Sequence, residues 1–179
     1  MPTTSWLYPT SATTLARSGS SGSWSDVTNI LADDTSYASL THYSFNPFYT
    51  PYLVAKGFEI ADHVPLAAEI LGIELDIARY EGQSNDNITD SELKLYNGGT
   101  LIGDNKGEAP EWSTGMQTIS YGGAADLWGA TLTPAIVRDA NFGAALSIYA
   151  SINLTTCYAY VDFMRMRITW RPLVAFEAF

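Results

Sequence analysis

The chain has 179 residues, of which 46% are hydrophobic and only 16% are charged, so it resembles a folded domain rather than a disordered acidic chain. Nine basic residues against nineteen acidic residues give a formal net charge of −10. This balance argues against nucleic acid as the main partner, because phosphate binding requires a surplus of Lys and Arg.

Residues 1–23 are predicted to form an extended N-terminal arm. Residues 16–23 read ARSGSSGS, which is the composition of a flexible linker. Ahead of this linker, Trp6, Leu7 and Tyr8 form a small apolar cluster that an isolated tail would have no reason to carry. We therefore predict that these three side chains bind a neighbouring subunit or another partner.

Residues 24–171 alternate between strand and turn signals at short intervals. One strand is predicted to start near Tyr37, another to span 53–60, and the clearest to span 71–80. In the clearest strand, apolar residues occupy every second position and should point to one face. Those residues are Ile73, Leu75 and Ile77.

The second half of the chain continues this pattern. A hairpin is predicted over 91–105, with Asn97-Gly98 as its tight turn. The further predicted strands are 116–123, 142–150 and 160–170. A short helical turn is expected at Thr133, the predicted N-cap, and Pro134, the predicted first helical residue. The pattern indicates an all-β, jelly-roll-like antiparallel β-sandwich.

Residues 172–179 are predicted to form an apolar tail. Pro172 cannot donate a hydrogen bond to a sheet, so the chain should leave the last strand there. The large apolar side chains of this tail are Leu173, Val174, Phe176 and Phe179. Exposing them would be costly, so we expect the tail either to fold back as an edge strand or to bind another chain.

The sequence contains no recognisable set of catalytic residues. The single cysteine, Cys157, has only His42 and His63 as imidazole partners, and neither lies in a catalytic sequence context. No G-x-S-x-G motif is present, and one buried cysteine is usually a small core residue. We therefore expect no enzymatic activity, although a hydrolase using two carboxylates stays open as an alternative.

Metal and cofactor sites are not predicted either. Two histidines and one cysteine do not make a zinc site of known spacing. Two acidic loops raise calcium as an alternative, one with Asp86, Asn87, Asp90 and Glu92 and the other with Asp33 and Asp34, but the spacing departs from the EF-hand. Loops rich in Asp and Asn are mainly turn formers.

The segment 121–129 combines an aromatic residue, two glycines, an acid and a Trp-Gly pair. One hypothesis is that Tyr121 and Trp128 line a shallow glycan-binding surface, since aromatic faces stack on sugar rings. We favour the other interpretation, in which Trp128 plugs one end of the sandwich while the glycines allow tight turns.

Several short motifs also occur in a fixed order along residues 24–171. They are Trp24, Asn29-Ile30-Leu31, Asp33, Tyr37-Ala38, Gly57-Phe58, Ile70-x-Gly72-Ile73, Asp90-x-x-Leu93-x-Leu95, Gly103, Asn105, Trp112, Tyr121-Gly122-Gly123, Asp126-Leu127-Trp128-Gly129, Asn141-Phe142-Gly143 and Val161-Asp162. Together they resemble a β-sandwich domain that recurs in tailed-bacteriophage virion proteins and in prophage-derived reading frames. The resemblance implies a virion structural role and supplies no catalytic residues.

These expectations combine into one functional hypothesis. We expect a capsid decoration or stabilisation protein, a trimer that binds the major capsid protein or another virion protein through its arm and tail. The sequence shows no signal peptide and no apolar run long enough to span a membrane, so we expect assembly in the bacterial cytoplasm without membrane contact. The alternative is a receptor- or glycan-binding module of a tail fibre or baseplate.

Overall fold

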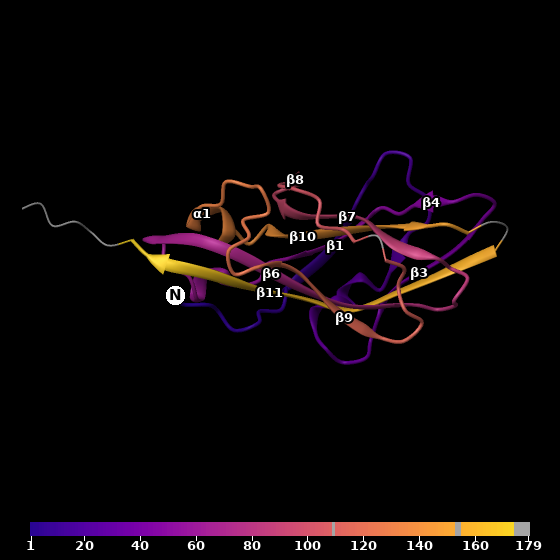
Figure 1. Ribbon diagram of the computed structural model, residues 1–179, viewed down its shortest axis with the longest axis horizontal. Coiled ribbons are helices and arrows are strands. Elements are labelled where there is room, and N and C mark those ends of the chain that lie inside the picture. The colour runs from indigo at the N-terminus through magenta and orange to yellow at the C-terminus, as the bar shows by residue number, and fades with distance from the viewer. Residues whose placement is uncertain (109, 153–154, 174–179) are drawn as a thin grey trace, which may run out of the picture.

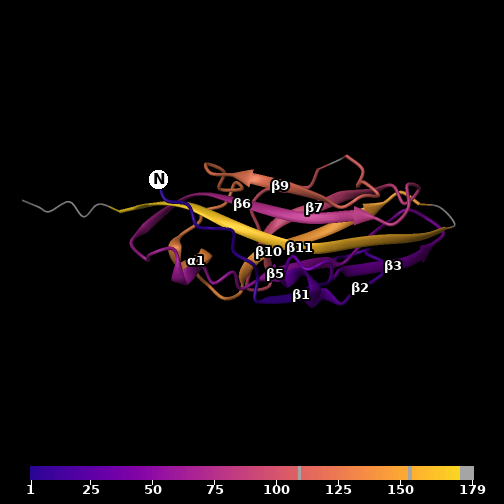
Figure 2. The ribbon, with the colours of Figure 1, turned by 90° about the horizontal axis from the view of Figure 1, so that it is seen from below.

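The computed structural model describes residues 1–108, 110–152 and 155–173, and these form a sandwich of two antiparallel sheets (Figures 1 and 2). The strands are β1 (Ser11–Leu15), β2 (Trp24–Ser25), β3 (Ala38–Ser44), β4 (Phe48–Tyr49), β5 (Tyr52–Lys56), β6 (Ala68–Glu81), β7 (Ile88–Asn97), β8 (Thr100–Ile102), β9 (Gln117–Gly123), β10 (Phe142–Ala150) and β11 (Thr155–Pro172). The helical turns are η1 (Val27–Leu31), η2 (Ile60–Asp62) and α1 (Pro134–Val137).

The strand order is that of a jelly roll. The six-stranded sheet has the order β1-β5-β10-β7-β8, with β4 also paired to β10, and the five-stranded sheet has the order β2-β3-β11-β6-β9. From β3 onward the chain passes back and forth between the sheets, so that β3-β11-β6-β9 faces β5-β10-β7-β8. The predicted all-β, jelly-roll-like class is therefore confirmed.

The core lies between the sheets and is built by two-residue alternation. Ile73, Leu75 and Ile77 of β6 are fully buried, as their spacing predicted. On β11, Met164 and Met166 are buried in the same core, while Arg165 between them lies partly exposed on the outer side of the sheet. Burial of these side chains is the main favourable contribution to the stability of the fold.

Several element boundaries differ from the prediction. β5 stops at Lys56 instead of continuing to 60, because Gly57 and Glu59 both take positive φ angles, 74° and 52°, that end an extended strand. The hairpin turn consists of Gly98 and Gly99 rather than 97 and 98, since Asn97 pairs directly with the first residue of β8. The helical turn is as predicted, with the hydroxyl of Thr133 accepting a hydrogen bond from the third residue of α1.

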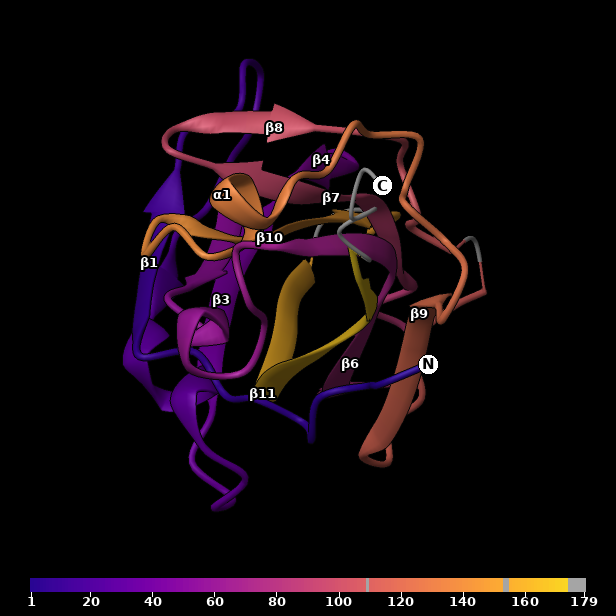
Figure 3. The ribbon, with the colours of Figure 1, turned by 90° about the vertical axis from the view of Figure 1, so that its left-hand side faces the viewer.

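The predicted N-terminal arm packs on its own chain. β1 lies within this segment and pairs with β5 at the edge of the six-stranded sheet. Ahead of β1, residues 2–8 pair with β11 in the other sheet, where Leu7 and Met166 exchange two backbone hydrogen bonds of 2.8 Å. The indigo segment in Figure 3 therefore joins both sheets. The expectation that a neighbouring subunit orders this arm is wrong, because β5 and β11 of the same chain pair with it.

The end of β11 agrees with the predicted stop at Pro172, and Leu173 donates a backbone hydrogen bond to Ala67. The Leu173 side chain is 57% exposed. The other tail residues for which partner binding was predicted, Val174, Phe176 and Phe179, lie outside the described residues. Within the described ranges, the structure has no helix that is long and apolar enough to cross a membrane.

Candidate functional site

The outer face of the five-stranded sheet carries a group of three tyrosines. Tyr80 of β6 and Tyr160 of β11 are directly paired across the two strands, and their rings stack with centroids 4.6 Å apart. Tyr37, just before β3, meets both rings edge to face at 5.4 Å and 6.0 Å. All three rings are partly exposed, and we call them the tyrosine cluster. Tyr80 and Tyr160 stand on this face because each lies between two buried, inward-pointing residues of its strand.

Acidic groups lie beside the tyrosine cluster. Asp162 of β11 is only 4% exposed and accepts hydrogen bonds from the backbone N–H groups of Asp34 and Thr35. Its Oδ1 atom has no hydrogen-bond partner among the described residues. Burial raises the pKa of the Asp162 carboxyl, and the nearby Asp33 raises it further. Burial likewise raises the pKa of Tyr80, and the neighbouring tyrosines and Asp162 add to that shift.

The remainder of the same face carries three ion pairs between β11 and β6. They are Arg165 with Asp76 (2.9 Å), Arg167 with Glu74 (2.7 Å) and Arg171 with Glu69 (2.6 Å). In the first two pairs, two guanidinium nitrogens bind the carboxylate, which fixes the geometry of both side chains.

Two of the predicted arm residues cover this charged region of their own chain. The ring of Trp6 lies over the guanidinium groups of Arg165 and Arg167, at 4.9 Å and 4.5 Å from the ring centre. Tyr8 meets Phe163 edge to face at 5.9 Å. Both arm side chains remain partly exposed, whereas Leu7 between them points into the core and is 8% exposed.

Tyr121 and Trp128 do not form the exposed glycan-binding surface that the sequence suggested. Trp128 is fully buried, and its indole N–H donates to the carbonyl of Ile73 at 3.0 Å. Tyr121 is 3% exposed because its position on β9, opposite Leu75, points inward. The hypothesis of a stacking surface at these two residues is therefore wrong, and the favoured interpretation, in which Trp128 fills the interior, is confirmed.

The acidic loop residues offered for calcium point to separate partners. Asp90 lies between the sheets, where it forms an ion pair of 3.3 Å with Arg79 and accepts a hydrogen bond from the Tyr121 hydroxyl at 2.6 Å. Glu92 accepts a hydrogen bond from Tyr52 on the outer side of the six-stranded sheet. In the part of the chain that the structure describes, no group of three His, Cys, Asp or Glu residues could hold a metal ion.

Cys157 lies directly opposite His42 in the pairing of β11 with β3, a contact that their separation in sequence did not reveal. The pair lacks the character of a catalytic dyad. Burial raises the pKa of the Cys157 thiol to about 12, and the nearby Asp86 and Glu81 contribute to that shift. A thiol with this pKa is protonated at neutral pH and is a poor nucleophile.

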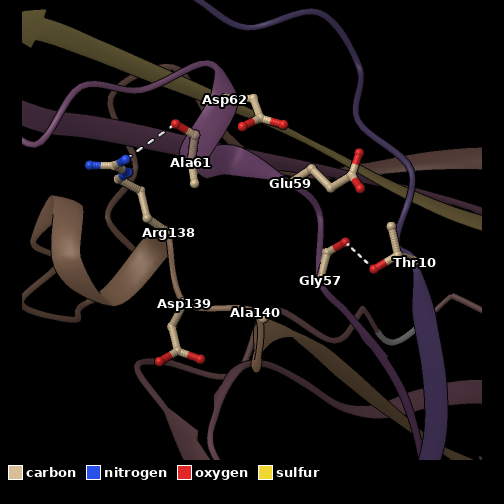
Figure 4. Close-up of a pocket in the computed structure, with 8 residues that line it drawn as sticks. All are labelled: Thr10, Gly57, Glu59, Ala61, Asp62, Arg138, Asp139 and Ala140. Carbon is tan, nitrogen blue, oxygen red and sulfur yellow. Dashed lines mark hydrogen bonds between the residues drawn. The ribbon is translucent and has the colours of Figure 1, made fainter.

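A pocket of about 300 Å³ opens beside η2 and α1 (Figure 4). It is lined by Thr10, Gly57, Glu59, Ala61, Asp62, Arg138, Asp139 and Ala140. Figure 4 shows the carboxylate of Asp139 on the opposite side of the pocket from those of Glu59 and Asp62, while the Arg138 guanidinium donates to the carbonyl of Ala61 at 3.3 Å. The pocket thus brings three carboxylates together with one guanidinium, from the segments around η2 and after α1.

The tyrosine cluster was not identified from the sequence, although a signal for it was present. Tyr158 and Tyr160 occupy alternate positions of the last strand, where residues between core positions are ordinarily small or polar. Large aromatic side chains at outward positions indicate a contact surface.

No family model matches the chain, and no curated protein matches it. A solved structure described as "CBM4 structure and function" is similar to it, with a TM-score of 0.45 and 10% sequence identity. The similarity covers 91% of this chain and 94% of that chain.

Proposed function

We propose that this protein is a non-catalytic binding module that recognises a glycan through the tyrosine cluster. The observation that carries the proposal is the group of partly exposed rings of Tyr37, Tyr80 and Tyr160 on the outer face of a sheet. Tyrosine combines an apolar ring, which packs against the C–H face of a sugar, with a hydroxyl that hydrogen-bonds to sugar hydroxyls.

The setting of these rings favours binding. Tyr80 and Tyr160 are anchored on two long paired strands, and each ring is held by contact with the others. A ligand that binds such rings loses little affinity to ordering of the protein, because their rotamers are already restricted.

Affinity measurements with a substituted tyrosine test the proposal. Candidate oligosaccharides are identified on a glycan array, and their dissociation constants are measured by calorimetry. Tyr160→Ala should weaken binding at least tenfold, which corresponds to about 1.4 kcal/mol. Tyr149→Ala is the matched control, because Tyr149 is a partly exposed tyrosine that packs against Tyr49 on the six-stranded sheet.

Both variants are first compared with the wild type by circular dichroism, so that a loss of binding is not a loss of folding. Equal affinity of the wild type and a folded Tyr160→Ala would contradict the proposal. A similar loss in Tyr149→Ala would place the binding surface elsewhere.

We propose virion assembly as the second candidate function, with the protein as a trimeric capsid decoration protein bound to the major capsid protein or another virion protein. The observation that favours it is a group of exposed apolar side chains at the end of the sandwich where β11 finishes. They are Met1 (88% exposed), Leu66 (67%) and Leu173 (57%). Their backbones are close there, since Leu173 binds Ala67 and Trp170 binds Pro2. Such side chains typically mark a contact with another protein.

Quantitative mass spectrometry of purified virions tests this second candidate through the copy number of the chain. Hundreds of copies per particle would support a position on the head lattice, and a handful would favour the tail. A double variant with Leu66→Ser and Leu173→Ser should reduce occupancy without unfolding the sandwich. Unchanged occupancy would contradict a role for this apolar end.

A further inference from the structure

We infer that the tyrosine cluster selects uncharged glycans and rejects acidic ones. This inference rests on the proposed function, and it assigns a ligand class to the same site. It follows from how charge is distributed over the outer face of the five-stranded sheet.

The basic groups on this face are already occupied. Arg165, Arg167 and Arg171 each hold a carboxylate of β6 at 2.6–2.9 Å. Two of them are bound through two nitrogens and are covered by Trp6. An acidic sugar would have to displace a protein carboxylate from such a pair, so it gains little from binding there.

The acidic groups nearest to the tyrosine cluster are not neutralised. Asp33 and Asp34 are exposed, and Asp162 is buried next to Tyr80 and Tyr160. The ion pairs formed by the described residues do not include any of these three acids. A uronate, sialate, sulfate or phosphate on the ligand would therefore meet uncompensated negative charge, while a neutral sugar would not.

A cationic ligand fits the cluster less well than a neutral one, despite the acids. A cage for an ammonium group needs aromatic rings spaced around an empty centre, with the cation within about 6 Å of each ring. The rings of Tyr37, Tyr80 and Tyr160 have centroids 4.6–6.0 Å apart and fill the space between themselves. The cluster thus offers outer faces, edges and hydroxyls, which suit a saccharide surface.

The test compares each acidic oligosaccharide with its carboxyl-reduced counterpart, in which the carboxylate has become a hydroxymethyl group. Wild-type protein should bind the neutral member of each pair at least tenfold more tightly, and Tyr160→Ala should lose that binding. Equal or tighter binding of the acidic members, still dependent on Tyr160, would overturn this inference and leave the proposed function intact. Binding of neither member in a Tyr160-dependent way would overturn the proposed function, and this inference with it.

A charge variant then tests the cause of the selectivity. In a double variant with Asp33→Asn and Asp34→Asn, affinity for the neutral sugar should stay within twofold of the wild type. Affinity for the acidic sugar should rise severalfold above that of the wild type. The difference in this affinity between the variant and the wild type should shrink as salt is added. An unchanged preference in this variant would overturn the electrostatic explanation.

Discussion

Truncation of Leu7 is the most informative test of where the N-terminal segment binds. The Leu7 side chain is 8% exposed and belongs to the main core, and its backbone N–H and carbonyl both pair with Met166. If this arrangement holds in solution, Leu7→Ala destabilises the isolated protein. If the segment instead binds a neighbouring subunit, the isolated protein should be insensitive to the change.

The size of the effect follows from burial. Truncating a buried leucine to alanine costs about 2–5 kcal/mol, depending on how far the surroundings relax. Leu7 lies in a peripheral segment that can relax, so we expect a loss of about 2 kcal/mol. For a chain of this length, that corresponds to a fall in Tm of about 4–8 °C.

Thermal unfolding followed by circular dichroism measures this change. Leu66→Ala is the matched control, because Leu66 is 67% exposed and its truncation should change stability by less than about 0.5 kcal/mol. Identical melting of Leu7→Ala and the wild type would refute docking of residues 2–8 on their own chain.

Three further changes probe the interior. Asp90→Ala should lower the free energy of unfolding, measured by urea titration, by about 3–5 kcal/mol, because it leaves the buried guanidinium of Arg79 uncompensated. A loss below about 1 kcal/mol would contradict a stabilising role for the Arg79–Asp90 ion pair. Burial raises the pKa of Glu81, with Asp86 adding to the shift, so the folded state holds this proton to a higher pH than the unfolded chain does. The contribution of Glu81 to stability should therefore decline as pH rises from about 4.3 through its raised pKa. Glu81→Gln should flatten the dependence of the unfolding free energy on pH over this range, and an unchanged dependence would contradict a raised pKa of Glu81. Cys157 should react with a thiol reagent at pH 8 only after urea is added, since its pKa is about 12 in the fold, and rapid labelling of the native protein would contradict this.

The fold was largely predictable because alternation along each strand is a local property. Ile73, Leu75 and Ile77 are buried where their spacing placed them, and the helical turn begins at Thr133 as its capping chemistry predicted. The strand limits were less predictable. The positive φ of Glu59, a residue that rarely adopts one, carries no sequence signal comparable to that of glycine.

The candidate site was not predictable in the same way, because it depends on register between distant strands. Tyr80 and Tyr160 become neighbours only when β6 pairs with β11, and the sequence does not specify that pairing. The dense motif that contains Tyr121 and Trp128 left both a surface site and a core position open, and only the structure shows that both side chains are buried. The apolar composition of a segment likewise predicts that it is buried, but it does not indicate whether its own chain or a partner buries it. For this reason Leu7 was assigned to a partner, although it packs in the core of its own chain.

The pairing of residues 2–8 with β11 also determines how the molecule responds to mechanical load. Pro2 accepts a hydrogen bond from Trp170, and Leu173 lies three residues after Trp170 in the chain. Pro2 and Leu173 therefore lie at the same end of the antiparallel pair that residues 2–8 form with β11. Tension applied between Pro2 and Leu173 acts across this pair and breaks its hydrogen bonds one after another, reaching those between Leu7 and Met166 last. The N-terminal segment should therefore peel away at low force while the rest of the jelly roll stays intact, which makes it the first element to yield under strain.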